Sequence, residues 1–277
     1  MRRTRARSPQ GILGTRRGLA ASVSLLLILF SLTIVSTIAY SYALGAIGSR
    51  KQDLKLVAAE EKMLDMESAI SAVVWSPGSI RTLAFSNYDG QLRVEPDANH
   101  LLLNATMDGT TYTLFDSDTG RFIYELPSTV VGHYGRWIRG DDRAIVNQSA
   151  SYQAQMSVGV GAEHEELIAR YRPLASSSVG DLVSGRRINN IRIYVVNLNS
   201  SASIESGGEF HVKVESENVT TQVQSYDLDA GVTKVDLKAV LNGAERTITV
   251  PLTVGASGST VRIEVVIGYV KIQGVEI

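Results

Sequence analysis

The sequence predicts an α+β protein in which one long N-terminal helix precedes a mainly antiparallel β-sandwich head. Three observations lead to this prediction: an uncharged stretch from Gly18 to Ser49, helical periodicity from residue 50 to 75, and alternating apolar residues beyond residue 78. We divide the chain into four parts: a basic leader at 1–18, a transmembrane helix continuing as an amphipathic helix at 19–75, a β-rich region at 76–180 and a β-sandwich-like region at 181–277.

The uncharged stretch predicts a membrane-spanning helix. Its apolar core, from Leu19 to Leu44, exceeds the roughly 20 residues needed to cross a bilayer. A cleaved secretory signal has an apolar core of only about 7–15 residues, so we expect this helix to be retained. Six arginines and no acidic residue precede it. The positive-inside rule then places the N-terminus in the cytoplasm and Arg50 onward outside the cell.

The helix is expected to continue to Trp75. Between residues 50 and 75, apolar residues recur at spacings of three, four or their sums, and charged residues occupy the other faces. Ser76-Pro77-Gly78 is a stop signal. We expect one face of this half to pack against the β head through Leu54, Val57, Leu64, Ile70 and Val73.

The remaining sequence predicts short strands. Leu101–Met107, Thr110–Phe115 and Arg121–Leu126 read as three strands separated by turns at Asp108-Gly109 and Asp118-Thr119-Gly120. Residues 139–175 are expected to add strands, and residues 176–181 are expected to form a loop. The best internal boundary lies at residues 176–184. Asn242-Gly243 is a hairpin signal. Apolar residues alternate again at 191–195, 210–214, 248–254 and 261–267.

Composition narrows the classes of function. The leader holds six of the 27 basic residues, leaving 21 against 28 acidic residues, a net charge of −7 outside it. We therefore expect no nucleic-acid partner, because such binding needs a basic surface. Cysteine is absent, which excludes disulfides and thiolate metal sites. The four histidines (His100, His133, His164 and His211) lack metal-ligand spacing, and no catalytic motif is present. We expect no enzyme activity, cofactor or metal.

Four sequons follow the apolar span, on the side expected to be extracytoplasmic. Their N-glycosylation candidates are Asn104, Asn147, Asn199 and Asn218. An unmodified surface asparagine is the alternative at each position.

The segment Arg16-Arg17-Gly18-Leu19-Ala20, with the apolar run behind it, resembles the class III signal of archaeal type IV pilins and archaellins. The resemblance implies a membrane-embedded prepilin peptidase that cuts between Gly18 and Leu19, so the helix stays in the mature protein. It also implies self-association, or association with other pilins, through residues 19–44. The heads would then face solvent in a surface filament with a structural or adhesive role, commonly as glycoproteins.

One departure and one alternative accompany this resemblance. Bacterial type IV pilins carry a glutamate five residues into the mature helix, where Val23 stands here, whereas archaeal members often lack it. Small residues such as Ala20, Ser24 and Ser31 permit close helix packing in lipid, but many transmembrane helices contain them. The alternative is a bitopic, signal-anchored protein whose extracytoplasmic β-domain binds a ligand, envelope polymer or partner protein. It would keep its leader.

Overall fold

The computed structural model describes residues 15–85, 90–126, 135–150, 152–161, 165–199, 202–204 and 210–275, and the side chains of 15–21 and 202–204 are not among the described parts. The chain forms two compact units, Met1–Asp53 and Leu54–Ile277.

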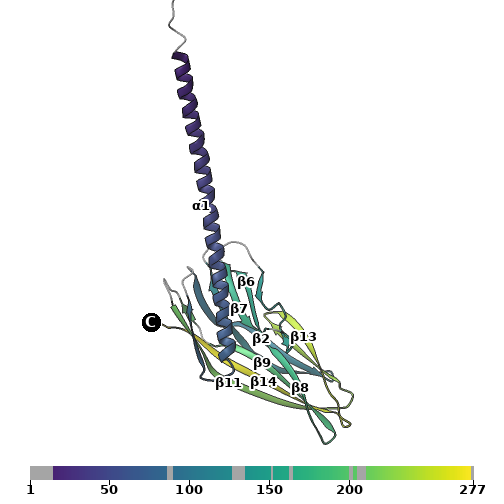
Figure 1. Ribbon diagram of the computed structural model, residues 1–277. Helices are drawn as coiled ribbons and strands as arrows, with labels where there is room; N and C mark the ends of the chain where they lie inside the picture. Colours follow the sequence, from purple (N-terminus) through teal and green to yellow (C-terminus); the bar gives the residue numbers. More distant parts are fainter. Residues whose placement is uncertain are drawn as a thin grey trace, which may run out of the picture. The chain divides into compact units, whose positions relative to one another are not determined.

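A single helix, α1 (Thr15–Val73), runs without interruption through the uncharged stretch and the amphipathic segment (Figure 1). The prediction of one continuous helix is confirmed. The helix ends at Val73, two residues before the predicted end at Trp75. Gly78, with a φ of 81°, follows in the predicted stop signal. Between Ser22 and Val73 the helix is long and apolar enough to cross a membrane, by length and composition.

Three hydroxyl groups in the apolar half of α1 are satisfied within the helix. The side chains of Ser31, Thr33 and Thr37 each donate to the carbonyl oxygen four residues earlier, at 2.8 Å. Such bonds hide polar groups from a surrounding that offers no water. The large apolar side chains from Val23 to Ile47 are exposed, as a lipid-facing helix requires.

The second unit contains fourteen strands among the described residues. They are β1 (Ile80–Phe85), β2 (Gln91–Met107), β3 (Thr110–Glu125), β4 (Trp137–Arg139), β5 (Val146–Asn147), β6 (Ala154–Val160), β7 (Glu165–Tyr171), β8 (Leu174–Val183), β9 (Arg186–Leu198), β10 (Ala202–Ile204), β11 (Phe210–Leu228), β12 (Lys234–Leu241), β13 (Ala244–Pro251) and β14 (Ser259–Val275).

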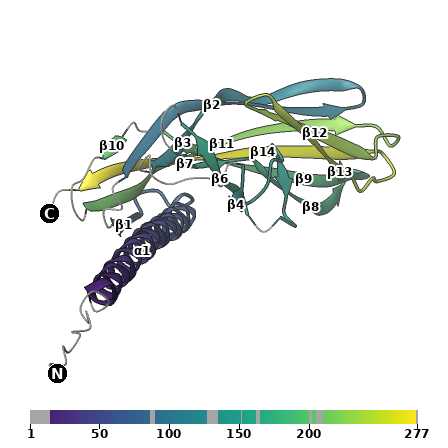
Figure 2. The ribbon, with the colours of Figure 1, turned by 90° about the horizontal axis from the view of Figure 1, so that it is seen from above.

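The strands form two facing sheets, which gives the sandwich-like head that the sequence predicts (Figure 2). One sheet, here sheet A, has the order β1-β11-β14-β9-β8-β5. The other, sheet B, has the order β13-β12-β2-β3-β7-β6-β4, with β10 added beside β2. Most neighbours are antiparallel, whereas β14 with β9 and β5 with β8 are parallel.

Two apolar clusters fill the space between the sheets. In the first, the C-terminal part of α1 packs among residues of both sheets, including Phe122 of sheet B and Val270 of sheet A. In the second, the sheets pack directly on each other, for example through Leu103 and Ile263. The sandwich is therefore completed at one end by the helix. Gly268 allows this, because a Cβ there would lie 2.5 Å from Val74 Cγ2.

The buried face of the helix differs from the expected one. Ile70 and Val73 are buried as expected and Leu64 is half-buried, but Leu54 and Val57 are 69% and 60% exposed. The buried stripe consists instead of Leu56, Ala59, Met63, Met66, Ile70 and Val73. Its alternating spacing of three and four residues keeps it on one side of the helix, whereas Glu61, Asp65 and Ser68 interrupt the face of Leu54 and Val57.

Two predicted hairpin turns are confirmed. Asp108-Gly109 and Asn242-Gly243 have positive φ at both positions, as the tight turns of two-residue hairpins require. The turn predicted at Asp118-Thr119-Gly120 is wrong, because β3 runs straight through it with Thr119 paired to Asn99. Glycine serves a different purpose at Gly120, where a Cβ would lie 2.1 Å from the carbonyl oxygen of Leu198.

The loop expected at residues 176–181 is also wrong. Residues 176–183 belong to β8, where they pair with β9. Each sheet takes strands from both sides of residue 180, so the regions 76–180 and 181–277 are not separate bodies. Small polar residues suggested a loop, but an exposed edge region of a sheet tolerates them equally well.

Candidate functional site

The segment between β4 and β6 crosses from one sheet to the other and back. β4 and β6 pair with each other in sheet B, whereas β5, between them, pairs with β8 in sheet A. The buried side chains of Ala144 and Ile145 anchor this segment in the second apolar cluster. The segment also carries the sequon at Asn147.

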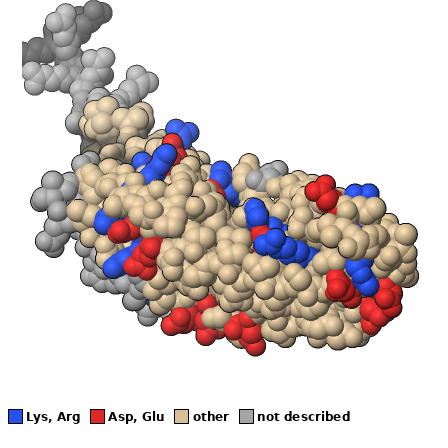
Figure 3. All heavy atoms as spheres, turned by 90° about the horizontal axis from the view of Figure 1, so that it is seen from below, with Lys and Arg blue, Asp and Glu red and all other residues tan. Residues whose placement is uncertain are grey.

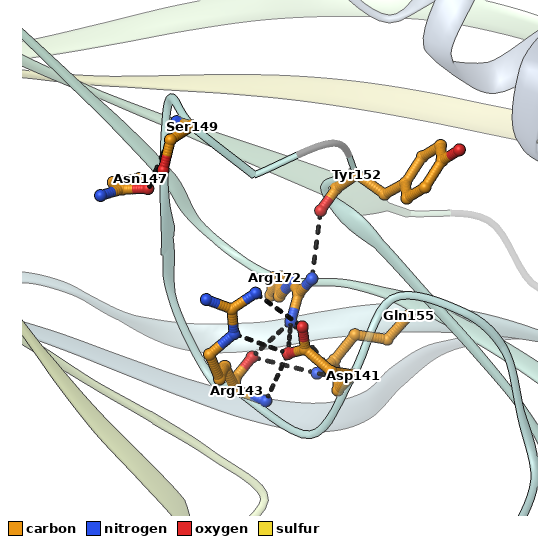
Figure 4. Close-up of polar contacts among 7 residues, drawn as sticks. All are labelled: Asp141, Arg143, Asn147, Ser149, Tyr152, Gln155 and Arg172. Carbon is orange, nitrogen blue, oxygen red and sulfur yellow. Dashed lines mark hydrogen bonds and ion pairs between the residues drawn. The ribbon is translucent and has the colours of Figure 1, made fainter.

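A buried arginine holds both ends of this segment (Figure 4). Arg172 is 2% exposed and follows the end of β7. Its Nη1 donates to the carbonyl oxygens of Asp141 and Arg143 at 3.3 and 3.1 Å, and its Nη2 donates to that of Tyr152 at 3.2 Å. The same guanidinium forms an ion pair with the Asp141 carboxylate. The Arg172 side chain thus binds the backbone near both ends of the crossing segment.

Asp141 is held as a carboxylate by this arrangement. The side chain of Arg143 donates to it from Nε at 2.9 Å and from Nη2 at 2.7 Å, and Arg172 adds its ion pair. The Arg143 bonds first, and then those of Arg172, lower the pKa of Asp141 well below its ordinary value. Gln155 completes the network, because its Nε2 donates to the carbonyl oxygens of Asp141 and Arg143 at 2.6 and 3.1 Å.

The Asn147 sequon lies exposed at the far side of this fixed segment. The hydroxyl and backbone N–H of Ser149 both donate to Asn147 Oδ1, at 2.5 and 3.3 Å. Asn147 is the last residue of β5, its side chain is exposed, and Ser149 lies in the short turn that follows (Figure 4). The sequon at Asn147 is therefore exposed and held by bonds to its Oδ1.

The other three sequons differ in access. Asn218 is exposed beside a bulge in β11. Asn199 is exposed after β9, but its Nδ2 donates to Glu217 Oε2 at 2.6 Å, and its sequon runs into residues outside the described ranges. Asn104 lies in the middle of sheet B between β12 and β3, and its Oδ1 is buried. The sheet therefore hinders access to Asn104 most.

We expect glycosylation of the folded head to favour Asn147 and Asn218 over Asn104, because a transferase must reach the acceptor nitrogen. Glycopeptide mass spectrometry of the native protein measures the occupancy of each site. The Asn147→Gln variant should lose one glycan mass, whereas Asn104→Gln, the matched control, should change nothing. A glycan at Asn104 with none at Asn147 would contradict the ranking.

Within the part of the chain that the structure describes, the remaining sequence-predicted positions form no further site. Gly18 and Leu19 lie within α1 on described backbone. His100 is exposed next to Asp116 and Asp118, and His211 is half-buried in β11. His133 and His164 lie outside the described residues. Within the described ranges no group of three or more His, Asp or Glu side chains could hold a metal ion. On the face seen in Figure 3, basic and acidic side chains are interspersed over a largely uncharged surface.

The fold and these sites define an α+β protein with an apolar N-terminal helix and a sandwich-like head. No protein-family model, curated protein or solved structure matches the chain. What the protein does is therefore inferred from its own residues.

Proposed function

We propose that this is a membrane-anchored cell-surface protein with a structural or adhesive role, a pilin-like filament subunit or minor pilin. The observation that carries the proposal is Arg16-Arg17-Gly18 directly before an uncharged stretch that continues, as one helix, into a β head. A signal cut before its apolar segment leaves that segment in the mature protein, where it can serve as anchor and assembly element.

Several features of α1 support an anchoring role. It has no charged residue from Gly18 to Ser49, and the hydroxyls of Ser31, Thr33 and Thr37 are bonded within the helix. Arginines at the N-terminal side favour a cytoplasmic N-terminus with the head outside. Small residues on its faces permit close approach of neighbouring helices, so residues 19–44 are the proposed surface for self-association or for other pilins.

Processing tests this proposal most directly. The native protein should begin at Leu19 and lack the mass of residues 1–18, because the peptidase cuts after Gly18. Gly18→Val should block the cut, since a β-branched side chain at the scissile position hinders the protease. Gly11→Val, also in the leader but away from the bond, should leave processing intact. N-terminal sequencing and intact mass measure both.

Retention of the leader in the native protein would contradict the pilin-like proposal. It would favour the bitopic alternative, in which the uncleaved helix only anchors a ligand-binding head.

A further inference from the structure

A small polar cavity lies on the outer face of sheet B, away from the apolar clusters. Its volume is about 250 Å³, and its walls include Arg121, Gln155, Trp137, Ser157, Ile168 and Arg170. The neighbours of these residues along the strands, such as Phe122, Met156 and Ala169, point into the first apolar cluster. The cavity residues therefore face outward, because successive side chains of a strand point to opposite faces.

Two arginines face each other across neighbouring strands in this cavity. Arg121 of β3 pairs directly with Arg170 of β7, and Arg170 pairs in turn with Gln155 of β6. Like charges directly opposite each other in a sheet are destabilising. An anion between them would relieve that repulsion.

The two guanidinium groups differ in their partners. Arg121 Nε donates to Glu95 Oε2 at 2.7 Å. Arg170 Nε donates to the neutral Gln155 Oε1 at 2.9 Å, and Arg170 has no ion pair among the described residues. Burial, and then the charge of Arg121, lower the pKa of Arg170. An arginine nevertheless keeps its charge in a protein.

Gln155 fixes the position of the Arg170 side chain. Gln155 Nε2 donates to the carbonyl oxygens of Asp141 and Arg143. The crossing segment, which Arg172 holds in place, therefore also orients the Gln155 side chain. Gln155 is 1% exposed and satisfied at both ends of its amide. Arg170 is therefore held through its Nε, and its two Nη groups have no hydrogen-bond partner among the described residues.

The rest of the cavity offers an apolar wall and a hydroxyl. Trp137 of β4, Ser157 of β6 and Ile168 of β7 lie in one cross-strand row, two residues along from the row of arginines. Trp137 is 37% exposed, so part of its indole is open to solvent. The volume is smaller than the roughly 300–1,000 Å³ of sites for drug-sized ligands, so it suits one small ring.

We propose that this cavity binds an acidic sugar residue, with its carboxylate on Arg170 and Arg121 and its ring against Trp137. Arginine binds carboxylates through paired, charge-assisted hydrogen bonds. The face of an indole suits the C–H groups of a sugar ring, and Ser157 supplies a hydroxyl for a ring substituent. A ligand with one carboxylate, hydroxyls and an apolar ring face thus matches each wall. The inference deepens the proposed adhesive role and rests on it for its biological setting.

The test uses the full-length chain in detergent with Trp75→Phe, so that Trp137 is the sole tryptophan. Titration with galacturonate should give a saturable change in Trp137 fluorescence. Galactose, which lacks the carboxylate, should bind at least about tenfold more weakly, as should the Arg170→Gln variant, since charge-assisted bonds are lost. Arg262→Gln, at an exposed arginine of sheet A, is the matched control and should leave binding unchanged.

Several results would overturn the proposal. They are the absence of saturable galacturonate binding, equal binding of galactose, binding of acetate or inorganic phosphate as tight as that of galacturonate, and unchanged binding by Arg170→Gln. Arg170→Gln should fold, because it removes a like-charge contact, and a thermal melt checks this. If it melts early, Arg170→Lys is compared instead: weaker binding with an unchanged melting temperature supports the proposal, and unchanged binding overturns it.

The outcome is separable from that of the proposed function. Loss of binding in a protein correctly cut after Gly18 would contradict the sugar site alone. An uncut leader in a protein that binds galacturonate would contradict the pilin-like role alone.

Discussion

Ile70→Asp is expected to unfold the β head, whereas Val57→Asp, the same change on the same helix, should leave it folded. Ile70 is fully buried in the cluster where α1 meets both sheets, and Val57 is 60% exposed. Loss of a large core side chain costs about 2–5 kcal/mol, and burying an unpaired charge adds several more. Their sum is comparable to the total stability of about 5–15 kcal/mol of a typical domain.

The measurement is a thermal or urea melt of the full-length protein in detergent, monitored by near-UV circular dichroism. Val57→Asp should shift the free energy of unfolding by no more than about 0.5 kcal/mol, as exposed substitutions usually do. Equal destabilisation by the two variants would mean that the helix packs through a face other than the stripe of Leu56, Met63, Met66 and Ile70.

Local patterns in the sequence predict much of the fold. The uncharged stretch and the stop signal predict α1 closely, because helix formation depends on nearby residues. Asp108-Gly109 and Asn242-Gly243 predict their turns for the same reason, since positive φ is set locally. Alternating apolar residues likewise predict the inward faces of β9, β11 and β14.

The sequence also encodes the buried face of α1, but through residues other than Leu54 and Val57. Leu54 and Val57 are strongly hydrophobic, but Glu61 and Asp65 interrupt their face of the helix. The stripe from Leu56 to Val73 contains alanine and methionine, which are less conspicuous, but it is unbroken for 18 residues. Regular spacing was the better guide than the hydrophobicity of single residues.

The sites depend on pairing between distant strands, which no local pattern encodes. Sequons mark acceptor asparagines, but only the sheet arrangement buries Asn104 Oδ1 and exposes Asn147. Arg121 and Arg170 are 49 residues apart in the chain, and their opposition follows from the register of β3 with β7. Arg172 follows a strand that already contains Glu165, Glu166 and Arg170, so its charge does not single it out, and its acceptors on the crossing segment have no sequence signal either.

Removing the Asp141 carboxylate should be the most damaging change outside the apolar clusters. Asp141→Ala leaves the buried Arg172 guanidinium without its counter-ion, and breaking such a pair typically costs about 3–5 kcal/mol. Since the Asp141 side chain is 38% exposed and Arg172 keeps its carbonyl acceptors, we expect about 3 kcal/mol, the lower end of that range. Asp142→Ala, at the exposed neighbour, is the matched control and should be nearly neutral.

The pH dependence of stability gives a second readout of the same carboxylate. The folded protein lowers the pKa of Asp141 below its ordinary value of 3.8, so the unfolded chain takes up the proton first as pH falls. The stabilisation is therefore complete above about pH 4–5 and is lost as pH falls toward the folded-state pKa. The stability difference between the unmodified protein and Asp141→Asn should be constant near neutral pH and shrink below pH 4. Urea melts across this range measure it, and a difference that stays constant down to pH 2, or that grows on acidification, would show that Asp141 is not the anion that holds Arg172 in place.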